Sequence, residues 1–267
     1  MDYINIFHNN GQNTHKLIYT IIKEIKQYLP DIDEYISQHL TKENYNDSII
    51  KYKNFTSEIN QYIDHTLLRA DATKNDIDKL YEELKEYNFN CVCINSSRAG
   101  YYSDKTCVVV GFPLGATNIE TKCYEIDDLW GLNGIKEVDF VINIGRIKDR
   151  DINYLIREIN EISKKCKEHQ FVSKAILETS ILTKEEIIIA SLICYYYNID
   201  FIKTSTGFST KGAEIDKVIL MLYLYHGKDV KVSGGIKDYD TAKTYLSIGV
   251  TRIGTSTGVN IIKQSIE

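Results

Sequence analysis

Asp200-Phe201-Ile202-Lys203-Thr204-Ser205-Thr206-Gly207-Phe208 is the stretch around which the sequence is organised. Its first five residues predict a buried strand, and strand alternation places Phe201 and Lys203 on one face and Ile202 on the other. Burial disfavours a lysine cation and favours the neutral amine, which is a nucleophile. A lysine at a strand end can also extend to solvent, so position alone leaves both interpretations of Lys203 open.

Seven further strands are expected on the two sides of this stretch, and helical patterns separate most of them. Strands that alternate with helices indicate a parallel sheet, and eight strands are the number that closes a TIM (β/α)8 barrel. The alternative is an open doubly wound sheet, which usually has a glycine-rich turn after its first strand, but none follows Leu67 or Asn95. The expected strands are Tyr62–Leu67, Cys91–Asn95, Cys107–Gly111, Glu137–Asn143, Val172–Glu178, Asp200–Thr204, Val230–Ser233 and Thr251–Gly254, and the expected helices are Asn75–Tyr87, Ile119–Asn133, Asp151–Glu168, Thr183–Tyr197, Glu214–His226 and Tyr239–Ile248.

One connection in this series is short. Only Ser96 to Thr106 separates the second expected strand from the third, which is too little for a full helix. We therefore expect a shortened helix or a loop at this crossover.

The first 55 residues differ from the rest of the chain. Apolar residues recur with helical spacing from Lys16 to Leu29, and Pro30-Asp31 would end such a helix. A second, polar helix is expected to reach His39. We therefore expect a helical N-terminal extension, residues 1–55, that packs on a barrel domain of residues 56–267. An arm for partner binding or oligomerisation is the alternative.

Composition limits the classes of protein that this chain can be. The net charge of −5 argues against a general nucleic-acid binder, which needs a basic face. Six scattered cysteines suit free thiols in a reducing cytoplasm. The N-terminus lacks the layout of a signal peptide, and no apolar run reaches the length of a membrane span. We therefore expect a cytoplasmic protein that binds neither nucleic acid nor membrane.

Charged residues gather at the expected strand ends. Catalytic groups of a TIM barrel lie at the C-terminal ends of its strands, where Lys203, Lys231 and Asp139 would meet. Charges inside a barrel must pair or shift their pKa values, which is unusual for a core that serves packing alone. Lys174 lies early in its strand, below this mouth, so we expect a structural ion pair for it, with Glu178 as the partner.

Three glycine-containing loops follow the last strands. The loops after the seventh and eighth strands hold phosphate in many TIM barrels, and helix N-termini there favour anions. A single Gly-Gly pair more often marks only a turn. Together, the unhindered backbone N–H groups of Gly207, Gly234, Gly235 and Gly254 and the hydroxyl of Ser256 predict a phosphate site.

Metal chemistry has little support in the sequence. No two of the six histidines have ligand spacing, and Cys91 and Cys93 form the only close cysteine pair. Cys93 lacks a histidine placed as its base, so a small residue that lines the barrel is the better interpretation. We interpret His65 as a hydrogen-bonded structural residue. No metal ion and no other cofactor are expected.

Six motifs resemble those of the deoxyribose-phosphate aldolases. They occur in unbroken order over roughly residues 58 to 262, and the N-terminal segment lies outside the resemblance. The short crossover around Ser96 to Thr106 departs from the family, which usually has a helix there. The motifs are Tyr62–Leu68, Val110–Thr117, Glu137–Gly145, Phe201–Thr210, Val230–Ile236 and Thr251–Ser256.

The resemblance implies a reaction and a role for each matching residue. The reaction is the reversible cleavage of 2-deoxy-D-ribose 5-phosphate to acetaldehyde and glyceraldehyde 3-phosphate. Lys203 matches the Schiff-base lysine, Lys231 the second lysine that lowers its pKa, and Asp139 the proton-shuttling carboxylate. It also implies a phosphosugar substrate, with a homodimer or a homotetramer as candidate assemblies. Substrate contacts are implied at Asp64, Thr66, Cys93, Thr206, Gly207, Gly234, Gly235, Gly254 and Ser256.

The chemistry of carbon–carbon cleavage agrees with these residue types. Breaking the bond leaves an electron pair, and an iminium at Lys203 accepts it without a metal electrophile. Protons must enter and leave, which requires an acid and base such as Asp139. Another Schiff-base aldolase of the same fold is the first alternative. A barrel that binds phosphometabolites without catalysis is the second.

Overall fold

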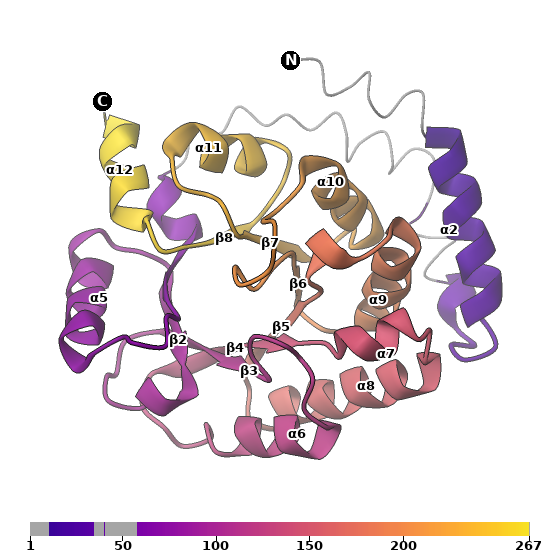
Figure 1. Cartoon of the computed structure of the whole chain (residues 1–267), viewed down its shortest axis with the longest axis horizontal. Coiled ribbons are helices and arrows are strands. Elements are labelled where there is room, and N and C mark those ends of the chain that lie inside the picture. Colours follow the sequence, from indigo (N-terminus) through magenta and orange to yellow (C-terminus); the bar gives the residue numbers. More distant parts are fainter. Residues whose placement is uncertain (1–10, 35–39, 41–57, 267) are drawn as a thin grey trace.

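Parallel strands form the centre of the structure, a computed structural model that describes residues 11–34, 40 and 58–266. Eight strands pair in chain order, and β1 also pairs with β8, so the sheet closes into a barrel. Helices surround this barrel (Figure 1), and the predicted TIM (β/α)8 fold is confirmed. The strands are β1 (Ile63–Leu67), β2 (Cys91–Asn95), β3 (Thr106–Val110), β4 (Ile135–Val141), β5 (Val172–Ile176), β6 (Phe201–Lys203), β7 (Asp229–Ser233) and β8 (Arg252–Thr255).

An α-helix follows every strand except β2. The connection from β2 to β3 holds only the 3-10 turn η2 (Ser96–Arg98), which confirms the expected short crossover. Two helices, α7 and α12, are additions to the expected pattern. The other short turns are η1 (Ile59–Tyr62) and η3 (Thr179–Ile181), and the helices of the barrel are α5 (Lys74–Glu86), α6 (Ile119–Asp127), α7 (Ile144–Lys148), α8 (Ile152–Glu168), α9 (Lys184–Tyr196), α10 (Ile215–Leu224), α11 (Tyr239–Ser247) and α12 (Gly258–Ile266).

Local sequence signals fix where helices begin. Thr73 caps α5, because its hydroxyl accepts the backbone N–H of Asp76 while the Asp76 carboxylate accepts the N–H of Thr73. Thr183 and Glu186 make the same reciprocal pair at the start of α9. These capping boxes satisfy N–H groups that a helix start would otherwise leave unpaired.

Strand alternation separates the core of the protein from its site. Ile202 and Val232 point away from the barrel axis and belong to the large apolar cluster beneath the helices. Their neighbours Lys203 and Lys231 point into the barrel and are almost completely buried. The alternation expected for Phe201 to Lys203 is therefore the feature that brings the lysine side chains to the barrel interior.

The N-terminal helix α2 (Gly11–Ile25) lies outside the ring of barrel helices and packs on α9 (Figure 1). It begins and ends earlier than the expected Lys16 to Leu29, although Leu29 is still completely buried in the turn that follows. The helix predicted up to His39 falls mostly outside the described residues. The extent of the extension, residues 1–55, therefore stays a prediction. None of the described helices combines the length and the apolarity that a membrane span requires.

Ile25→Ala should show how strongly α2 is attached. Ile25 is completely buried, so its truncation should lower the free energy of unfolding by about 2–5 kcal/mol. The control is Tyr19→Ala on the exposed side of the same helix, where a change below about 1 kcal/mol is expected. Denaturant titration followed by circular dichroism measures both, and equal effects of the two variants would contradict the packing of α2 on α9.

Candidate active site

The barrel interior carries a cluster of charged side chains from β1 and from β4 to β8. Strand register brings them together: Asp139 pairs with Lys174 across β4 and β5, and Lys203 pairs with Lys231 across β6 and β7. All four side chains are buried. Because buried charges are costly unless paired, the contacts of this cluster decide which chemistry it can support.

Asp139 is the centre of the cluster. Its Oδ2 accepts hydrogen bonds from Lys203 Nζ at 2.7 Å and from Lys231 Nζ at 2.8 Å. Its Oδ1 accepts one from Lys174 Nζ at 2.8 Å. Burial alone would raise the pKa of Asp139, but the three lysine ammonium groups outweigh it and hold the pKa well below its ordinary value. Asp139 is therefore an anion that organises three lysines.

Lys231 and Lys174 are held as cations. Burial opposes their charge, but neighbouring carboxylates outweigh it and raise the pKa of both lysines well above the ordinary value. Lys231 donates to Asp64 Oδ2 at 2.5 Å in addition to Asp139. Lys174 forms a second ion pair with Glu137 at 2.6 Å.

The expected pairing of Lys174 with Glu178 is wrong. Strand β5 ends at Ile176, and Glu178 has a left-handed backbone (φ 58°) in the loop beyond it. Lys174 lies lower in the barrel, where Glu137 and Asp139 are its partners. The Glu178 carboxylate instead accepts the backbone N–H of Thr206 at 3.1 Å and the Thr206 hydroxyl, and so fixes the loop after β6.

Above the cluster lies an open cavity of about 360 Å³ at the mouth of the barrel. Lys203 lines it, although only 2% of this residue is exposed. The loops after β6, β7 and β8 form one wall, and the end of β1 forms another. Among the predicted site residues, those that line the cavity are Thr66, Lys203, Thr206, Gly207, Gly234, Gly235, Gly254 and Ser256.

Four predicted site residues lie beneath this cavity and do not line it: Asp64, Cys93, Asp139 and Lys231. Each is completely buried. Asp139 binds Lys203 directly, and Lys231 binds the same oxygen of Asp139. Both residues therefore lie at the cavity floor. Asp64 reaches the site only through Lys231, and this arrangement supports a role in holding the lysine rather than in contacting substrate.

The glycine loops leave room for an anion. A side chain at Gly254 would place its Cβ 2.4 Å from Ser233 Oγ and 3.1 Å from Lys231 Cε, so a larger residue there would displace these two side chains. At Gly235 the backbone is left-handed (φ 81°), and no atom lies within 4 Å of the place of a Cβ. The buried hydroxyls of Ser205 and Ser233 have no hydrogen-bond partner among the described residues, and Ser233 lines the cavity, where its hydroxyl is available to a ligand.

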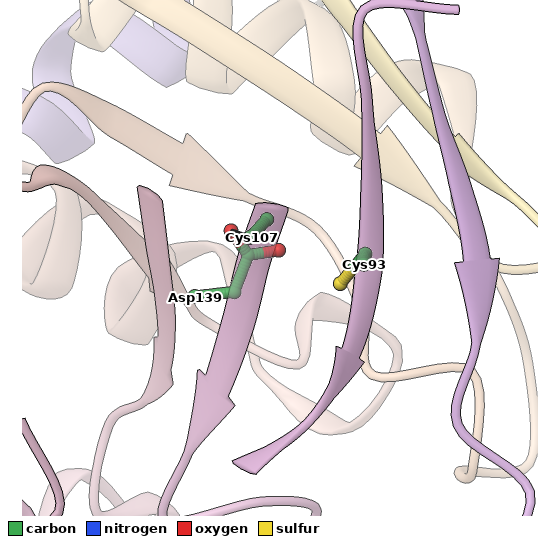
Figure 2. Close-up of side chains that lie close together, drawn as sticks. All are labelled: Cys93, Cys107 and Asp139. Carbon is green, nitrogen blue, oxygen red and sulfur yellow. Dashed lines mark hydrogen bonds between the residues drawn. The ribbon is translucent and has the colours of Figure 1, made fainter. Parts of the chain in front are cut away.

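Two buried groups contain donors that metals use. Cys93, Cys107 and Asp139 come from three neighbouring strands, and their donor atoms lie within 4.8 Å of one another (Figure 2). The expectation that the sequence holds no ligand cluster was therefore incomplete. The surroundings nevertheless disfavour a cation: Asp139 already binds three ammonium groups, and Lys174 Nζ lies 3.3 Å from Cys107 Sγ.

The second such group is Asp64, Cys91 and Glu137. Arg252 Nη1 lies at 2.8 Å from Asp64 Oδ1 and at 3.0 Å from Glu137 Oε2, between the two carboxylates. A guanidinium therefore takes the place that a metal ion would need. The donor sets fit ion pairing and proton transfer better than they fit metal coordination.

Together, the closed barrel and a lysine at its mouth that shares a carboxylate oxygen with a second lysine define an aldolase of the lysine type. The DeoC/LacD family aldolase model matches residues 59–265, and the chain belongs to this family. The helix α2 lies outside the match.

Named relatives agree with this class. A deoxyribose-phosphate aldolase of Streptococcus gordonii is 43% identical over 77% of this chain and 96% of its own length. One from Ureaplasma parvum serovar 3 is 42% identical, again over 77% of this chain and 98% of its own length. Among solved structures, an aldolase called QR15 is 33% identical, with a TM-score of 0.74 over 78% of this chain and 96% of its own. A deoxyribose phosphate aldolase from Aeropyrum pernix, described as tetrameric, is 27% identical, with a TM-score of 0.75 over 85% of this chain and 99% of its own.

Sequence reasoning missed Glu137 and Arg252. Both lie near the strand starts, at the end of the barrel that is opposite the mouth. A rule that examines only the C-terminal strand ends gives such residues no weight. The available signal was a charge at an inward strand position, two residues before Asp139 in one case and two before Gly254 in the other.

Lys174→Met should reveal the energetic weight of the cluster. The change removes a cation that Glu137 and Asp139 share, so it should lower the free energy of unfolding by about 3–5 kcal/mol. The control is Lys74→Met, which breaks an exposed pair with Asp78 and should cost less than about 1 kcal/mol. Urea titration measures the free energy of unfolding of both variants. A loss for Lys174→Met no larger than that for Lys74→Met would contradict the ion pairs described for Lys174.

Proposed function

We propose that this protein catalyses the reversible cleavage of 2-deoxy-D-ribose 5-phosphate to acetaldehyde and D-glyceraldehyde 3-phosphate, through a Schiff base on Lys203. The observation that carries the proposal is the sharing of Asp139 Oδ2 by Lys203 and Lys231. Two ammonium groups on one oxygen repel each other, which favours reaction at one of the two lysines as an amine. The relatives named deoxyribose-phosphate aldolase support the choice of substrate.

The contacts favour Lys203 as the nucleophile of the pair. The rest of the buried cluster contains three carboxylates and three cations, so it is electrically balanced without a charge on Lys203. Lys105 also reaches one carboxylate, but from the surface, where solvent screens it. The carboxylates are Asp64, Glu137 and Asp139, and the cations are Lys174, Lys231 and Arg252.

Position also favours Lys203 over the rival Lys174. Lys203 lines the cavity, where a sugar aldehyde can reach its amine. Lys174 is completely buried below the cavity and binds two carboxylates. We assign nucleophilic attack to Lys203 and a structural role to Lys174.

The chemistry then proceeds from the neutral amine of Lys203. The amine adds to the C1 carbonyl of the open-chain sugar, and loss of water gives an iminium. A base removes the proton of the C3 hydroxyl, the C2–C3 bond breaks, and its electron pair moves to the iminium nitrogen as an enamine. Glyceraldehyde 3-phosphate leaves. Protonation of the enamine carbon and hydrolysis of the iminium release acetaldehyde and restore the lysine.

Asp139 and Lys231 serve the proton transfers. Because its pKa lies well below the ordinary value, Asp139 passes a proton on rather than keeping it. Lys231 is a cation in contact with the same oxygen and can donate a proton to a developing hydroxyl or hydroxide. Thr66 and Thr206 present hydroxyls to the cavity and suit hydrogen bonds to the sugar.

The phosphate is proposed to bind over Gly207, Gly234, Gly235, Gly254 and Ser256. Glycine lets the anion approach the backbone N–H groups closely. The basic side chains of Arg69 and Lys237, which also line this cavity, favour a phosphate there.

The two alternatives make different demands. Another aldolase of the same type would keep the lysine pair but would not need the phosphate cradle. A barrel that only binds phosphometabolites would not need the amine at the cavity floor. The presence of both features together supports the deoxyribose-phosphate aldolase assignment.

Location and assembly belong to the proposal as well. All six cysteines are free, and five of them are buried in the barrel interior or in the apolar core, which suits a reducing cytoplasm. A homodimer or a homotetramer is proposed, and the Aeropyrum pernix relative, described as tetrameric, supports such an assembly.

The covalent step has a direct test. Sodium borohydride with acetaldehyde should reduce the iminium and inactivate the enzyme, and peptide mass spectrometry should find the ethyl adduct on Lys203. The companion measurement is the cleavage of deoxyribose 5-phosphate by the untreated protein. An adduct on Lys174 with Lys203 unmodified would contradict the assignment of the Schiff base to Lys203. Trapping on Lys203 without cleavage of the sugar phosphate would instead favour another aldolase of this type.

The phosphate cradle is tested by Gly235→Ala. A methyl group there should obstruct the anion and raise KM for deoxyribose 5-phosphate about tenfold or more, with much less effect on unphosphorylated deoxyribose. Gly227→Ala is the matched control, since Gly227 has the same left-handed backbone (φ 83°) and the same open space but lies in the turn before β7. Equal losses on both sugars, or equal losses in both variants, would point to backbone strain instead of a lost phosphate contact.

A further inference from the structure

Arg252 joins two carboxylates at the base of the charged cluster. A single nitrogen, Nη1, makes both bonds: it donates to Asp64 Oδ1 at 2.8 Å and to Glu137 Oε2 at 3.0 Å. The guanidinium carbon lies 5.3 Å from the centre of the Phe201 ring, and only 12% of the side chain is exposed. A guanidinium that is packed and bound in this way has little freedom to move.

Asp64 connects this arginine to the lysine pair. Its two oxygens are used separately: Oδ1 faces Arg252, and Oδ2 faces Lys231. Asn90 and Cys91 add further hydrogen bonds to Oδ1, at 3.1 Å and 3.0 Å. The orientation of the carboxylate is therefore fixed from below, and the orientation fixes where Lys231 Nζ can lie.

We propose that Arg252 is a positioning residue for the aldol reaction, which acts through Asp64 to hold Lys231 on the carboxylate oxygen that Lys203 uses. The inference rests on the proposed function and adds a residue outside the cavity to it. Arg252 does not line the cavity and so does not touch the substrate.

Arginine suits this role because its charge is permanent. A guanidinium does not lose its proton in a protein, so it cannot compete with Lys203 or Lys231 for proton transfer. Glu137, which also pairs with Lys174, anchors the guanidinium on its other side. The result is a chain of alternating charges that runs from Glu137 through Arg252, Asp64 and Lys231 to Asp139.

Loss of Arg252 should have a defined effect on pH dependence. Although burial opposes it, the positive charges of Lys231 and Arg252 hold the pKa of Asp64 below its ordinary value, so removal of Arg252 raises that pKa. Asp64 also loses the contact that fixes its orientation, so Lys231 Nζ is no longer held in one place. The cluster as a whole loses one positive charge, so it releases a proton less readily. The alkaline pH that activity requires should therefore increase.

The experiment compares Arg252→Gln with Arg252→Lys in the full chain. Arg252→Gln should lower kcat for cleavage of deoxyribose 5-phosphate by about tenfold to a hundredfold, as expected for a misplaced catalytic group, with KM nearly unchanged. The acidic limb of the rate profile should shift to higher pH. Because one nitrogen makes both bonds, the ammonium of Arg252→Lys should restore much of the rate and of the profile. Arg146→Gln, an exposed arginine paired with Asp151, is the control and should change neither.

A double variant separates positioning from folding. Asp64→Asn combined with Arg252→Gln removes one anion and one cation, so the charge of the cluster is unchanged. If Arg252 acts through Asp64, the double variant should be no slower than Asp64→Asn alone. Additive losses, or an Arg252→Gln enzyme with the wild-type rate and profile, would overturn the proposal.

A second readout does not depend on the sugar phosphate. The rate at which borohydride traps acetaldehyde on Lys203, measured against pH, should shift in Arg252→Gln as the cleavage rate does. A wild-type protein that is trapped but does not cleave deoxyribose 5-phosphate would contradict the proposed substrate and leave this comparison valid. A trapping profile identical in wild type and Arg252→Gln would contradict the inference itself.

Discussion

The ion pairs of Asp139 with Lys174, Lys203 and Lys231 are the interaction on which the site depends. A carboxylate in a barrel interior costs several kcal/mol unless cations compensate it, and three lysine side chains do so here. The compensation is unequal. Lys174 is the one lysine of the three on Oδ1, which also accepts from Cys107, whereas Lys203 and Lys231 share Oδ2. The charge balance of the barrel interior and the proposed nucleophile therefore depend on the same carboxylate.

The closed sheet is what makes this arrangement possible. Residues on neighbouring strands lie about 4.8 Å apart, so inward side chains at matching register are forced together. The pairs Asp139 with Lys174 and Lys203 with Lys231 arise from register alone. Asp64 and Lys231 meet because β8 joins β7 to β1 and closes the ring. In an open sheet, β1 and β8 would be opposite edges, and Asp64 could not stabilise Lys231.

Much of the fold and the main site residues could be predicted from the sequence, because the signals are local. Alternation along Phe201 to Lys203 gives the direction of the lysine, and the repeated strand and helix pattern gives the barrel. Pairing between strands is not a local property. The partner of Lys174 was predicted wrongly for this reason: Glu178 is near in sequence, but register places Asp139 beside Lys174. Glu137 and Arg252 were missed because the strand starts carry no functional weight in such reasoning.

The barrel interior is divided into two chemically different halves. A small apolar cluster comes from the loop after β1 and from β2 and β3: Leu68, Cys91, Cys93, Cys107 and Val109. The lysines and most of the carboxylates come from β4 to β8. This apolar half keeps water away from the charged half, and ion pairs are stronger where the local dielectric is low. The charged half opens to the cavity above Lys203, from which a substrate would reach it.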